Sequence, residues 1–304
     1  MHARCVQDDT VVDAAWQSDH TMRVRRYDDP AAFESEAGDF LLAREAEHNL
    51  ILGLLSELRS PDSRYPEHYL ATVTDDDQIL ACALRTPPFQ VALSHIEDPE
   101  AVDALVDDLY EADPRLSGVL ADRASAERFV SLWCERTGAI ATRAMEQRIH
   151  VATRAERPLG IEGSMRDATE EDRDVLRAWF AAFDRDTGGV QPIRELDERV
   201  THWLTSPERD LVLWVVDDGP VSMAGSTGPT LNGVRVGAVY TPPELRGRGY
   251  ATANVAALTR RLFDSGRRFC FLYTDLANPV SNAIYAKIGY APVCDVDQYR
   301  FGAR

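Results

Sequence analysis

The chain has 304 residues, of which 44% are hydrophobic, and a formal net charge of −17 at pH 7. This length accommodates two domains of ordinary size, and this apolar content supports a packed core rather than disorder. The acidic balance excludes a nucleic-acid partner, which requires clustered cations, and the lack of an eighteen-residue apolar run predicts no membrane partner and no membrane span.

The net charge is unevenly distributed between the two halves of the chain, and the cysteines are scattered along it. Residues 1–155 contain 29 acidic and 15 basic residues, a net charge of −14, whereas residues 156–304 have a net charge of −3. Long-range steering of a cationic acceptor and ordinary solubility charge both explain this surplus. The five cysteines form no C-x-x-C pair, so the sequence predicts no metal site, no disulfide framework and a cytoplasmic location.

Residues 1–22 are polar and acidic and contain no apolar segment of the kind that a secretory signal needs. We therefore expect them to form a tail. The apolar periodicity of the next part predicts alternating strands and helices. In chain order these are a strand at 24–27, a helix at 30–58, a hairpin of strands at 69–73 and 79–84, a strand at 90–94, a helix at 101–110, a strand at 118–121 and a helix at 124–135 that ends near Gly138.

The second half repeats this order. Its predicted elements are a strand at 164–166, helices at 170–183 and 193–204, strands at 211–216, 221–226 and 234–240, a helix at 252–263, a strand at 267–274 and a helix that ends at Gly289. Sequential strands and helices in this order indicate a mixed α/β sheet flanked by helices. We expect two domains, at 23–155 and 156–304, joined near residues 150–163.

The loop at 241–251, Thr-Pro-Pro-Glu-Leu-Arg-Gly-Arg-Gly-Tyr-Ala, separates a predicted strand from a predicted helix. Such a helix start presents free backbone N–H groups and a partial positive charge, which suit a phosphate. The loop has no lysine, which excludes a Walker phosphate loop, and Thr252 stands where a dinucleotide-binding fingerprint requires its third glycine.

A second motif follows about thirty residues later. Asn278 is placed to cap a short helix, Pro279 suits its first position, and Gly289 suits its end. Tyr285 lies within this helix, and Gly289-Tyr290 closes it.

Together the two motifs resemble the GNAT superfamily of N-acetyltransferases. Arg246, Gly249 and Ala251 match its Arg/Gln-x-x-Gly-x-Gly/Ala acyl-CoA loop, and Asn278, Tyr285 and Gly289-Tyr290 match the segment that follows. The resemblance covers residues 161–301. It implies two fused GNAT-like domains, each a mostly antiparallel twisted sheet flanked by helices, in which the first copy is degenerate. At 96–100 that copy has Ile-Glu-Asp-Pro-Glu, an acidic and glycine-free stretch that would repel a pyrophosphate.

The resemblance also assigns roles to residues. It implies an acyl-CoA cosubstrate, most simply acetyl-CoA, and an amine on a small molecule or peptide as acceptor. Tyr285 would be the general acid that protonates the departing thiolate, and a backbone N–H at the end of strand 234–240 would be the oxyanion donor. The residues expected to bind the cofactor are Val239, Tyr240, Thr241, Arg246, Gly247, Arg248, Gly249, Tyr250, Ala251, Thr252, Asn278 and Asn282.

The remaining assignments stay open at the level of sequence. His202, Asp275 and Glu170 are candidates for a general base, although water could also remove the amine proton. Each cofactor residue has a structural alternative, such as helix capping for Asn278 or surface charge for Arg246 and Arg248. The expected function is an acyl-CoA-dependent N-acyltransferase, and the alternative is an acyl-CoA-binding regulatory protein without turnover. The oligomeric state is left open.

Overall fold

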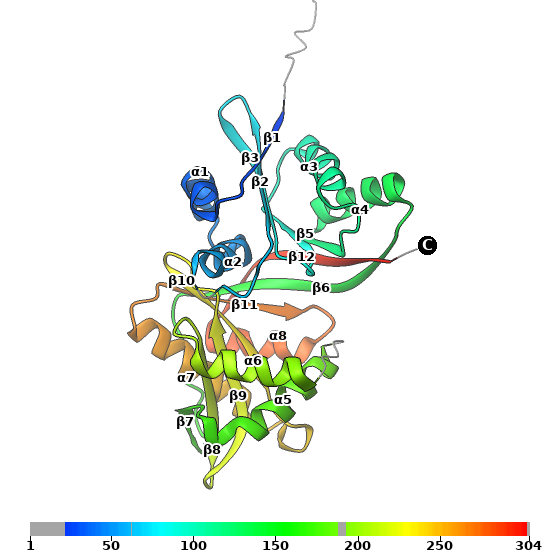
Figure 1. Ribbon diagram of the computed structural model, residues 1–304. Coiled ribbons are helices and arrows are strands. Elements are labelled where there is room, and N and C mark those ends of the chain that lie inside the picture. The colour runs from blue at the N-terminus through cyan, green and yellow to red at the C-terminus, as the bar shows by residue number, and fades with distance from the viewer. Residues whose placement is uncertain (1–21, 62, 188–192, 303–304) are drawn as a thin grey trace, which may run out of the picture.

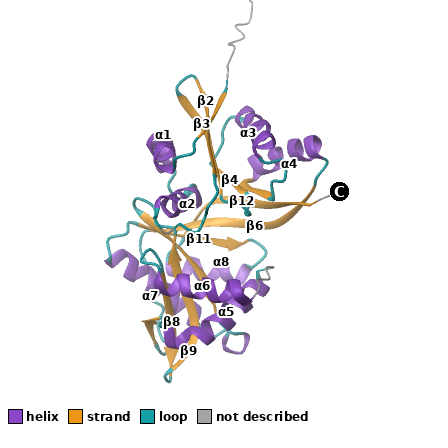
Figure 2. Cartoon of the chain, in the orientation of Figure 1, coloured by secondary structure: helices purple, strands orange, loops and turns teal. Residues whose placement is uncertain are grey.

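The computed structural model describes residues 22–61, 63–187 and 193–302. The expected N-terminal tail therefore lies outside the described residues, apart from Met22. The described part forms one mixed sheet of twelve strands, ordered β1-β2-β3-β4-β5-β12-β6-β11-β10-β9-β8-β7, with helices on both faces (Figure 2). This arrangement confirms the mixed α/β architecture.

The first half places six strands and four helices before residue 153. They are β1 (Arg23–Arg26), α1 (Pro30–Ala43), α2 (Asn49–Arg59), β2 (Tyr69–Asp75), β3 (Gln78–Arg85), β4 (Val91–Leu93), α3 (Pro99–Ala112), β5 (Gly118–Asp122), α4 (Arg123–Thr137) and β6 (Ile140–Ala152).

The second half repeats this order. Its elements are β7 (Ser164–Asp167), the 3-10 turn η1 (Glu170–Asp172), α5 (Arg173–Asp186), α6 (Ile193–Thr205), β8 (Asp210–Val216), β9 (Gly219–Thr227), β10 (Gly233–Tyr240), the 3-10 turn η2 (Pro243–Leu245), α7 (Tyr250–Asp264), β11 (Phe269–Asp275), α8 (Pro279–Ile288) and β12 (Ala291–Gly302).

The two halves exchange their last strands. β6 of the first half pairs antiparallel with β11 of the second half, and β12 of the second half pairs antiparallel with β5 of the first. β6 and β12 also pair with each other along most of their length, at the centre of the sheet (Figure 1). The strand order is symmetric about this pair, so the chain has an internal pseudo-twofold arrangement in which each half completes the sheet of the other.

Two features differ from the sequence-based expectations. The helix expected at 30–58 is two helices, because residues 44–48 form turns and α2 begins afresh at Asn49. An unbroken apolar spacing does not reveal such a break, since the bend is imposed by tertiary packing. The exchanged strands β6 and β12 were not predicted at all. Both are rich in charged residues, so they lack the regular alternation of a half-buried strand.

The side chains of the sheet alternate between two helical layers. In the first half, Leu70, Cys82 and Leu84 pack with α1 and α2, whereas Val73 and Ala83 pack with α3 and α4. In the second half, a cluster containing Met223 and Tyr240 packs with α5 and α6, and a cluster containing Val236 and Leu272 packs with α7. Hence α2 and α6 lie on one face of the sheet, and α4 and α7 on the other.

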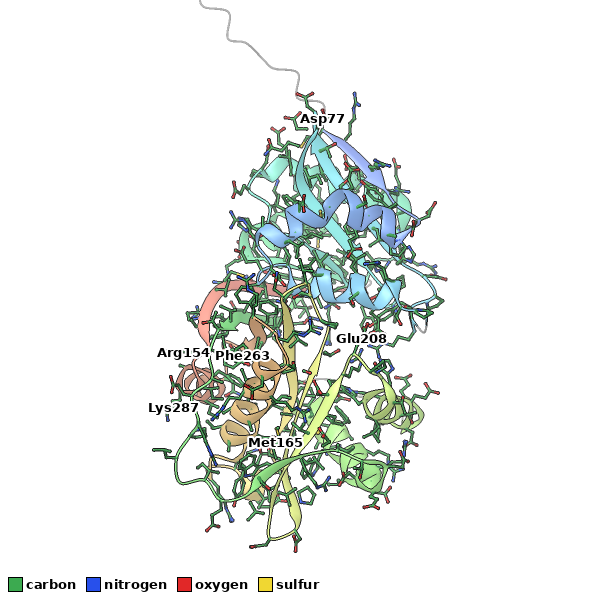
Figure 3. The ribbon with its side chains drawn as sticks, turned by 90° about the vertical axis from the view of Figure 1, so that its left-hand side faces the viewer. Asp77, Arg154, Met165, Glu208, Phe263 and Lys287 are labelled. Carbon is green, nitrogen blue, oxygen red and sulfur yellow. The ribbon has the colours of Figure 1, made fainter. Side chains whose placement is uncertain are left out.

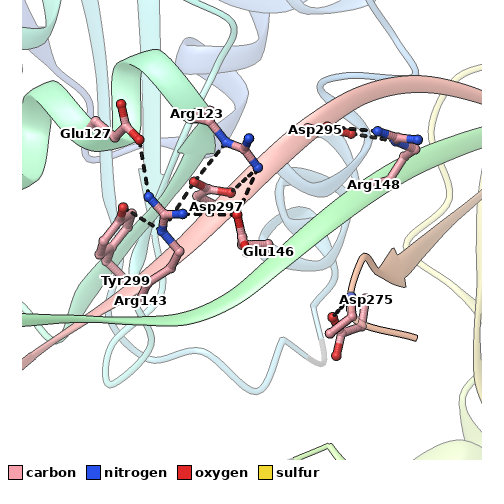
Figure 4. A network of polar contacts seen from close by, with 10 residues as sticks. Arg123, Glu127, Arg143, Glu146, Arg148, Asp275, Asp295, Asp297 and Tyr299 are labelled. Carbon is pink, nitrogen blue, oxygen red and sulfur yellow. Dashed lines mark hydrogen bonds and ion pairs between the residues drawn. The ribbon is translucent and has the colours of Figure 1, made fainter. Parts of the chain in front are cut away.

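A charged network closes the central seam on the α4 face (Figure 4). The carboxylate of Asp297 on β12 is fully buried and lies 3.3 Å from Arg123 and 3.6 Å from Arg143. Both arginines also pair with Glu146 on β6, at 3.0 Å each. Because one carboxylate serves two cations from different elements, this network ties β12 to β6 and to α4.

Contacts from α2 and from the turn before it also cross between the halves. Glu45, which precedes α2, is buried and accepts hydrogen bonds from Thr230 and from both Asn232 nitrogens, the latter at 2.8 Å each. Gly53 of α2 packs so closely that an added Cβ would lie 2.9 Å from the Cα of Gly228. Figure 3 shows the turn that carries Glu208 directly below the first half. The halves are therefore joined by side-chain packing as well as by exchanged strands.

None of the described helices is long and apolar enough to cross a membrane.

Candidate active site

The central feature of the second half is the separation of two parallel strands. β10 pairs with β11 only over residues 233–235, although it stays paired with β9 as far as Tyr240. The register shifts between Gly237 and Tyr240, where Ala238 has a φ of +50°. This is a β-bulge in which two residues of β10 oppose one of β9, and such a bulge leaves backbone groups outside the ladder. The separation starts at Val236, six residues before Pro242.

The glycine loop connects this bulge to α7. η2 forms one turn, and the backbone then takes positive φ at Gly247 (+80°) and at Gly249 (+83°), conformations that favour glycine. Gly249 is the N-cap of α7, and no side chain caps this helix start. The first backbone bond into the helix is donated by the N–H of Ala253 to the carbonyl of Gly249. Within the described part of the chain, the N–H groups of residues 250–252 therefore have no partner and could bind an anion.

The two loop arginines have different roles in the structure. Arg246 donates from Nε to the carbonyl of Thr241 at 2.9 Å and pairs with Asp186 of α5 at 2.6 Å. Its guanidinium also lies over the ring of Tyr240, 5.7 Å from the centroid. Arg246 thus holds the loop against the strand end. Arg248 is exposed, and its side chain forms no hydrogen bond or ion pair within the described part of the chain.

Tyr285 of α8 lies on the α7 face. It packs against the same apolar cluster as Val239, and its ring meets that of Tyr290 edge-on at 6.1 Å. Burial raises the pKa of Tyr285 to about 12, so the phenol keeps its proton at neutral pH. No hydrogen bond to its hydroxyl group is formed among the described residues. The structure therefore brings Tyr285 and Val239 to one cluster and leaves the phenol available as a donor.

The structure describes the surroundings of the two predicted asparagines, Asn278 and Asn282, only in part. Asn278 lies directly before α8, its side chain is exposed, and its backbone N–H donates to the carbonyl of Asp275 at 3.0 Å. The backbone of Asn282 belongs to α8, but its side chain lies outside the described part of the structure. α8 begins at Pro279 and ends before Gly289, which has a φ of +116°, as expected.

The three candidates for a general base are dispersed. His202 faces α2, where its Nε2 lies 3.8 Å from Glu57, and burial, followed by the charge of Arg209, lowers its pKa. Glu170 is held by Arg173 at the surface. Asp275 ends β11 and accepts from the backbone N–H of residue 277 (Figure 4). Among the described residues, neither His202 nor Glu170 forms a hydrogen bond or ion pair with Tyr285.

The equivalent place in the first half is closed. α3 has an aspartate, Asp98, as its N-cap, and this carboxylate accepts from the backbone N–H of Glu100 at 2.9 Å. β4 is only three residues long, and the next residue, Ser94, continues to bond to Cys82 of β3. A side-chain carboxylate therefore occupies the helix start that is free in the second half. This observation agrees with the expectation that the first copy is degenerate.

Sequence reasoning missed two parts of this site. The bulge at Ala238 was not predicted, although small residues inside a strand, here Gly237-Ala238, are a known signal for one. The pairing of Arg246 with Asp186 was also missed, and no local pattern could reveal it because the two residues lie on different elements. Among the described residues, no group of three or more histidine, cysteine or acidic side chains could hold a metal ion.

Comparisons with known proteins agree with this geometry. Residues 175–290 match the model of the acetyltransferase (GNAT) family. No curated protein matches the chain. Among solved structures, a Drosophila protein of a structural genomics programme covers 92% of this chain and 98% of its own, with a TM-score of 0.67 and 14% identity.

Two further structures have similar folds. A GCN5-related N-acetyltransferase from Kribbella flavida has a TM-score of 0.55 at 17% identity and covers 86% of this chain and 96% of its own. A tandem GNAT protein from the clavulanic acid biosynthesis pathway has a TM-score of 0.56 at 11% identity and covers 93% and 98%. At these identities the likeness concerns the fold. Taken with the family match, the bulged strand and the free helix start, it shows that this chain carries a GNAT acetyltransferase domain within its second half.

Proposed function

We propose that the protein is an acyl-CoA-dependent N-acyltransferase that transfers an acetyl group from acetyl-CoA to a primary amine. The observation that carries this proposal is the start of α7, where free N–H groups and two positive-φ glycines adjoin a bulged, separated strand. That combination suits a pyrophosphate at the helix start and a pantetheine arm along the open edge of β10. Acetyl-CoA would supply the activated acyl group as a thioester.

Each step of the transfer has a residue or backbone group in the second half. The N–H groups of residues 247–252, aided by Arg248, would bind the pyrophosphate. The backbone of Val239, Tyr240 and Thr241 would bind the pantetheine arm, and an N–H of the bulge would donate to the thioester oxygen. Asn278 and Asn282 lie at the start of α8, where they would contact the cofactor.

The chemistry is a direct displacement. The amine nitrogen bonds to the acetyl carbon, the carbon–sulfur bond breaks, and the Tyr285 hydroxyl donates its proton to the sulfur. The excess proton of the amine leaves to water, so that one proton is released from nitrogen for each one that Tyr285 gives to sulfur. The raised pKa of Tyr285 keeps the donor protonated before transfer, and the proton is regained from solvent afterwards.

Calorimetric titration of the full chain with acetyl-CoA and with coenzyme A tests the proposal. Gly249→Asp introduces a carboxylate at the N-cap of α7, where φ is positive and the new Cβ would lie 2.6 Å from the side chain of Ile161. We expect it to weaken binding of both at least about tenfold, since the carboxylate repels the pyrophosphate and the strained position disturbs the loop. The matched control is Gly266→Asp. Gly266 also has a positive φ (+98°), at the far end of α7, and open space beside it.

Thiol release with a panel of primary amines then separates catalysis from binding. Binding with turnover supports the transferase. Binding without turnover of any amine supports the alternative, a regulatory protein that only binds acyl-CoA. A well-folded chain that binds neither coenzyme A nor acetyl-CoA refutes the proposal.

A further inference from the structure

Arg235 occupies the point where β10 leaves β11. It is the last residue of β10 that pairs with β11, opposite Phe271. Its neighbours Val234 and Val236 face the α7 layer, so Arg235 points to the opposite face, where its Nη1 reaches Asn49 of α2. The guanidinium therefore lies on the side of the sheet opposite to Tyr285.

Arg235 has no counter-ion in the part of the chain that the structure describes. Its contact with Asn49 Oδ1 is long, at 3.4 Å, and it forms no ion pair with any carboxylate in the described residues. Burial lowers its pKa, and the other groups that act on its charge are Tyr273 and Tyr65. By contrast, Arg209 nearby is paired with Glu57 at 3.1 Å. A partly buried cation without a paired carboxylate is costly, which makes Arg235 a candidate for binding an anion.

Open space lies beside Gly237, on the same face of β10 as Arg235. Gly237 follows Arg235 by two residues, so a side chain at position 237 would lie on the same face of the strand. A Cβ built on Gly237 would meet no atom within 4 Å. Gly237 also begins the bulge that would hold the thioester oxygen. Two strand residues span roughly 7 Å, so Arg235 and the start of the bulge lie roughly that far apart along the same face of β10.

The surrounding groups favour a single negative charge. The Tyr273 hydroxyl accepts from Asn49 Nδ2 at 3.2 Å, which leaves its own proton free to donate. Arg64 donates to Tyr65 at 2.8 Å and forms no ion pair among the described residues. This local excess of cations contrasts with the net charge of −17 for the chain. One guanidinium and one phenol suit a carboxylate better than a dianionic phosphate.

We propose that the acceptor carries a carboxylate as well as its amine, and that Arg235 binds this carboxylate while the amine reaches the bulge of β10. The proposal rests on the proposed N-acyltransferase function and specifies its substrate class. The distance along β10 favours an amine separated from its carboxylate by several bonds, as in an ω-amino acid or the side-chain amine of lysine, over an α-amine.

The test is a series of acceptors of increasing chain length, assayed by thiol release from acetyl-CoA. It compares glycine, β-alanine, 4-aminobutanoate and 6-aminohexanoate with the corresponding primary amides, which keep the amine and the chain length but lose the charge. We expect the longer acids to have a KM about ten- to hundredfold below that of their amides, the range of a charged hydrogen bond. We also expect glycine to show no such advantage.

Arg235→Gln should remove this discrimination by raising the KM of the acids about ten- to hundredfold, with kcat/KM for the amides changed less than threefold. The matched control is Arg267→Gln, because Arg267 lies nearby and donates to the carbonyl of Thr230. If Arg235→Gln fails to fold, Asn49→Asp offers a second variant. It places a carboxylate beside Arg235 from another element and should abolish the same preference.

Equal KM values for acids and amides in the unaltered protein would overturn the carboxylate proposal and leave the transferase intact. If no amine releases thiol, titration of 6-aminohexanoate and its amide into the coenzyme A complex decides. Tighter binding of the acid, lost in Arg235→Gln, supports the proposal, and equal binding or none overturns it. Failure to bind coenzyme A would instead refute the proposed function.

Discussion

Tyr285 and Tyr290 form a matched pair that separates catalysis from stability. Their rings lie 6.1 Å apart, and both pack against the same cluster, yet their hydroxyl groups differ. That of Tyr290 is bonded to Thr259 at 2.8 Å within the core, whereas that of Tyr285 has no bond among the described residues. Removing the hydroxyl group of Tyr285 should therefore affect catalysis and not stability, whereas removing that of Tyr290 should affect stability and not catalysis.

Tyr285→Phe should lower kcat by roughly a hundredfold or more, the usual contribution of a general acid, with an unchanged Kd for acetyl-CoA. Its free energy of unfolding should change by less than about 0.5 kcal/mol, because no hydrogen bond is lost. Tyr290→Phe should cost about 1 kcal/mol of unfolding free energy and leave kcat nearly unchanged, since one buried hydrogen bond is removed. Thiol release, calorimetry and urea denaturation measure these three quantities.

The pH dependence gives a second readout of the same group. Because burial raises the pKa of Tyr285 to about 12, its protonated form persists through pH 10. The rate should therefore not decline between pH 8 and 10 on account of this group. A decline near pH 9 that disappears in Tyr285→Phe would refute the assigned pKa, and equal kcat in the two phenylalanine variants would refute the acid role.

Three further predictions concern the loop, the junction between the halves and an interior histidine. Arg248→Ala should weaken coenzyme A binding several-fold in calorimetry without loss of stability. Arg246→Ala should reduce both the affinity and the stability, because only Arg246 holds the loop to the strand end. Equal stabilities of the two variants would contradict this assignment. Glu45→Ala should lower the unfolding free energy by about 3 kcal/mol in urea, since it leaves the buried donors of Asn232 without an acceptor, and Glu45→Gln should cost less. Burial lowers the pKa of His48, so the unfolded chain binds a proton at this histidine more readily than the folded chain does. The unfolding free energy should therefore fall as the pH drops below about 6.5. His48→Gln should flatten this dependence of stability on pH, and an unchanged dependence would exclude this histidine as its cause.

The parts of the fold that sequence predicted are those encoded locally. The hairpin of β2 and β3, the αL stop at Gly138 and the start of α8 at Pro279 each follow from a turn or capping residue and an apolar period. The break between α1 and α2 and the strands β6 and β12 are encoded by partners far away in the chain. The charges of β6 are the clearest example, because Glu146 and Arg148 read as loop residues until β12 and α4 supply their counter-ions.

The candidate site divides in the same way. Gly249 and Tyr285 were predicted because a glycine loop and a helix with its stop signals lie in contiguous sequence. Arg235 was not singled out, since an arginine inside a strand is ordinary in sequence and becomes informative only when its surroundings lack a carboxylate. Arg246 shows the converse, because the same motif position that suggested phosphate binding proves to be engaged by Asp186.

The strand exchange explains why a degenerate half persists beside a GNAT domain. A fragment starting at residue 156 would lack β6, so the edge of β11 at residues 270–275 would lose its ladder partner, and β12 would lose both neighbours. Such an unpaired edge favours aggregation. The first half also supplies Asn49 to the side of the sheet where the acceptor would enter. A first half without a cofactor loop is therefore compatible with retention of its fold, because it completes the sheet and lines the side of the second half where the proposed acceptor would enter.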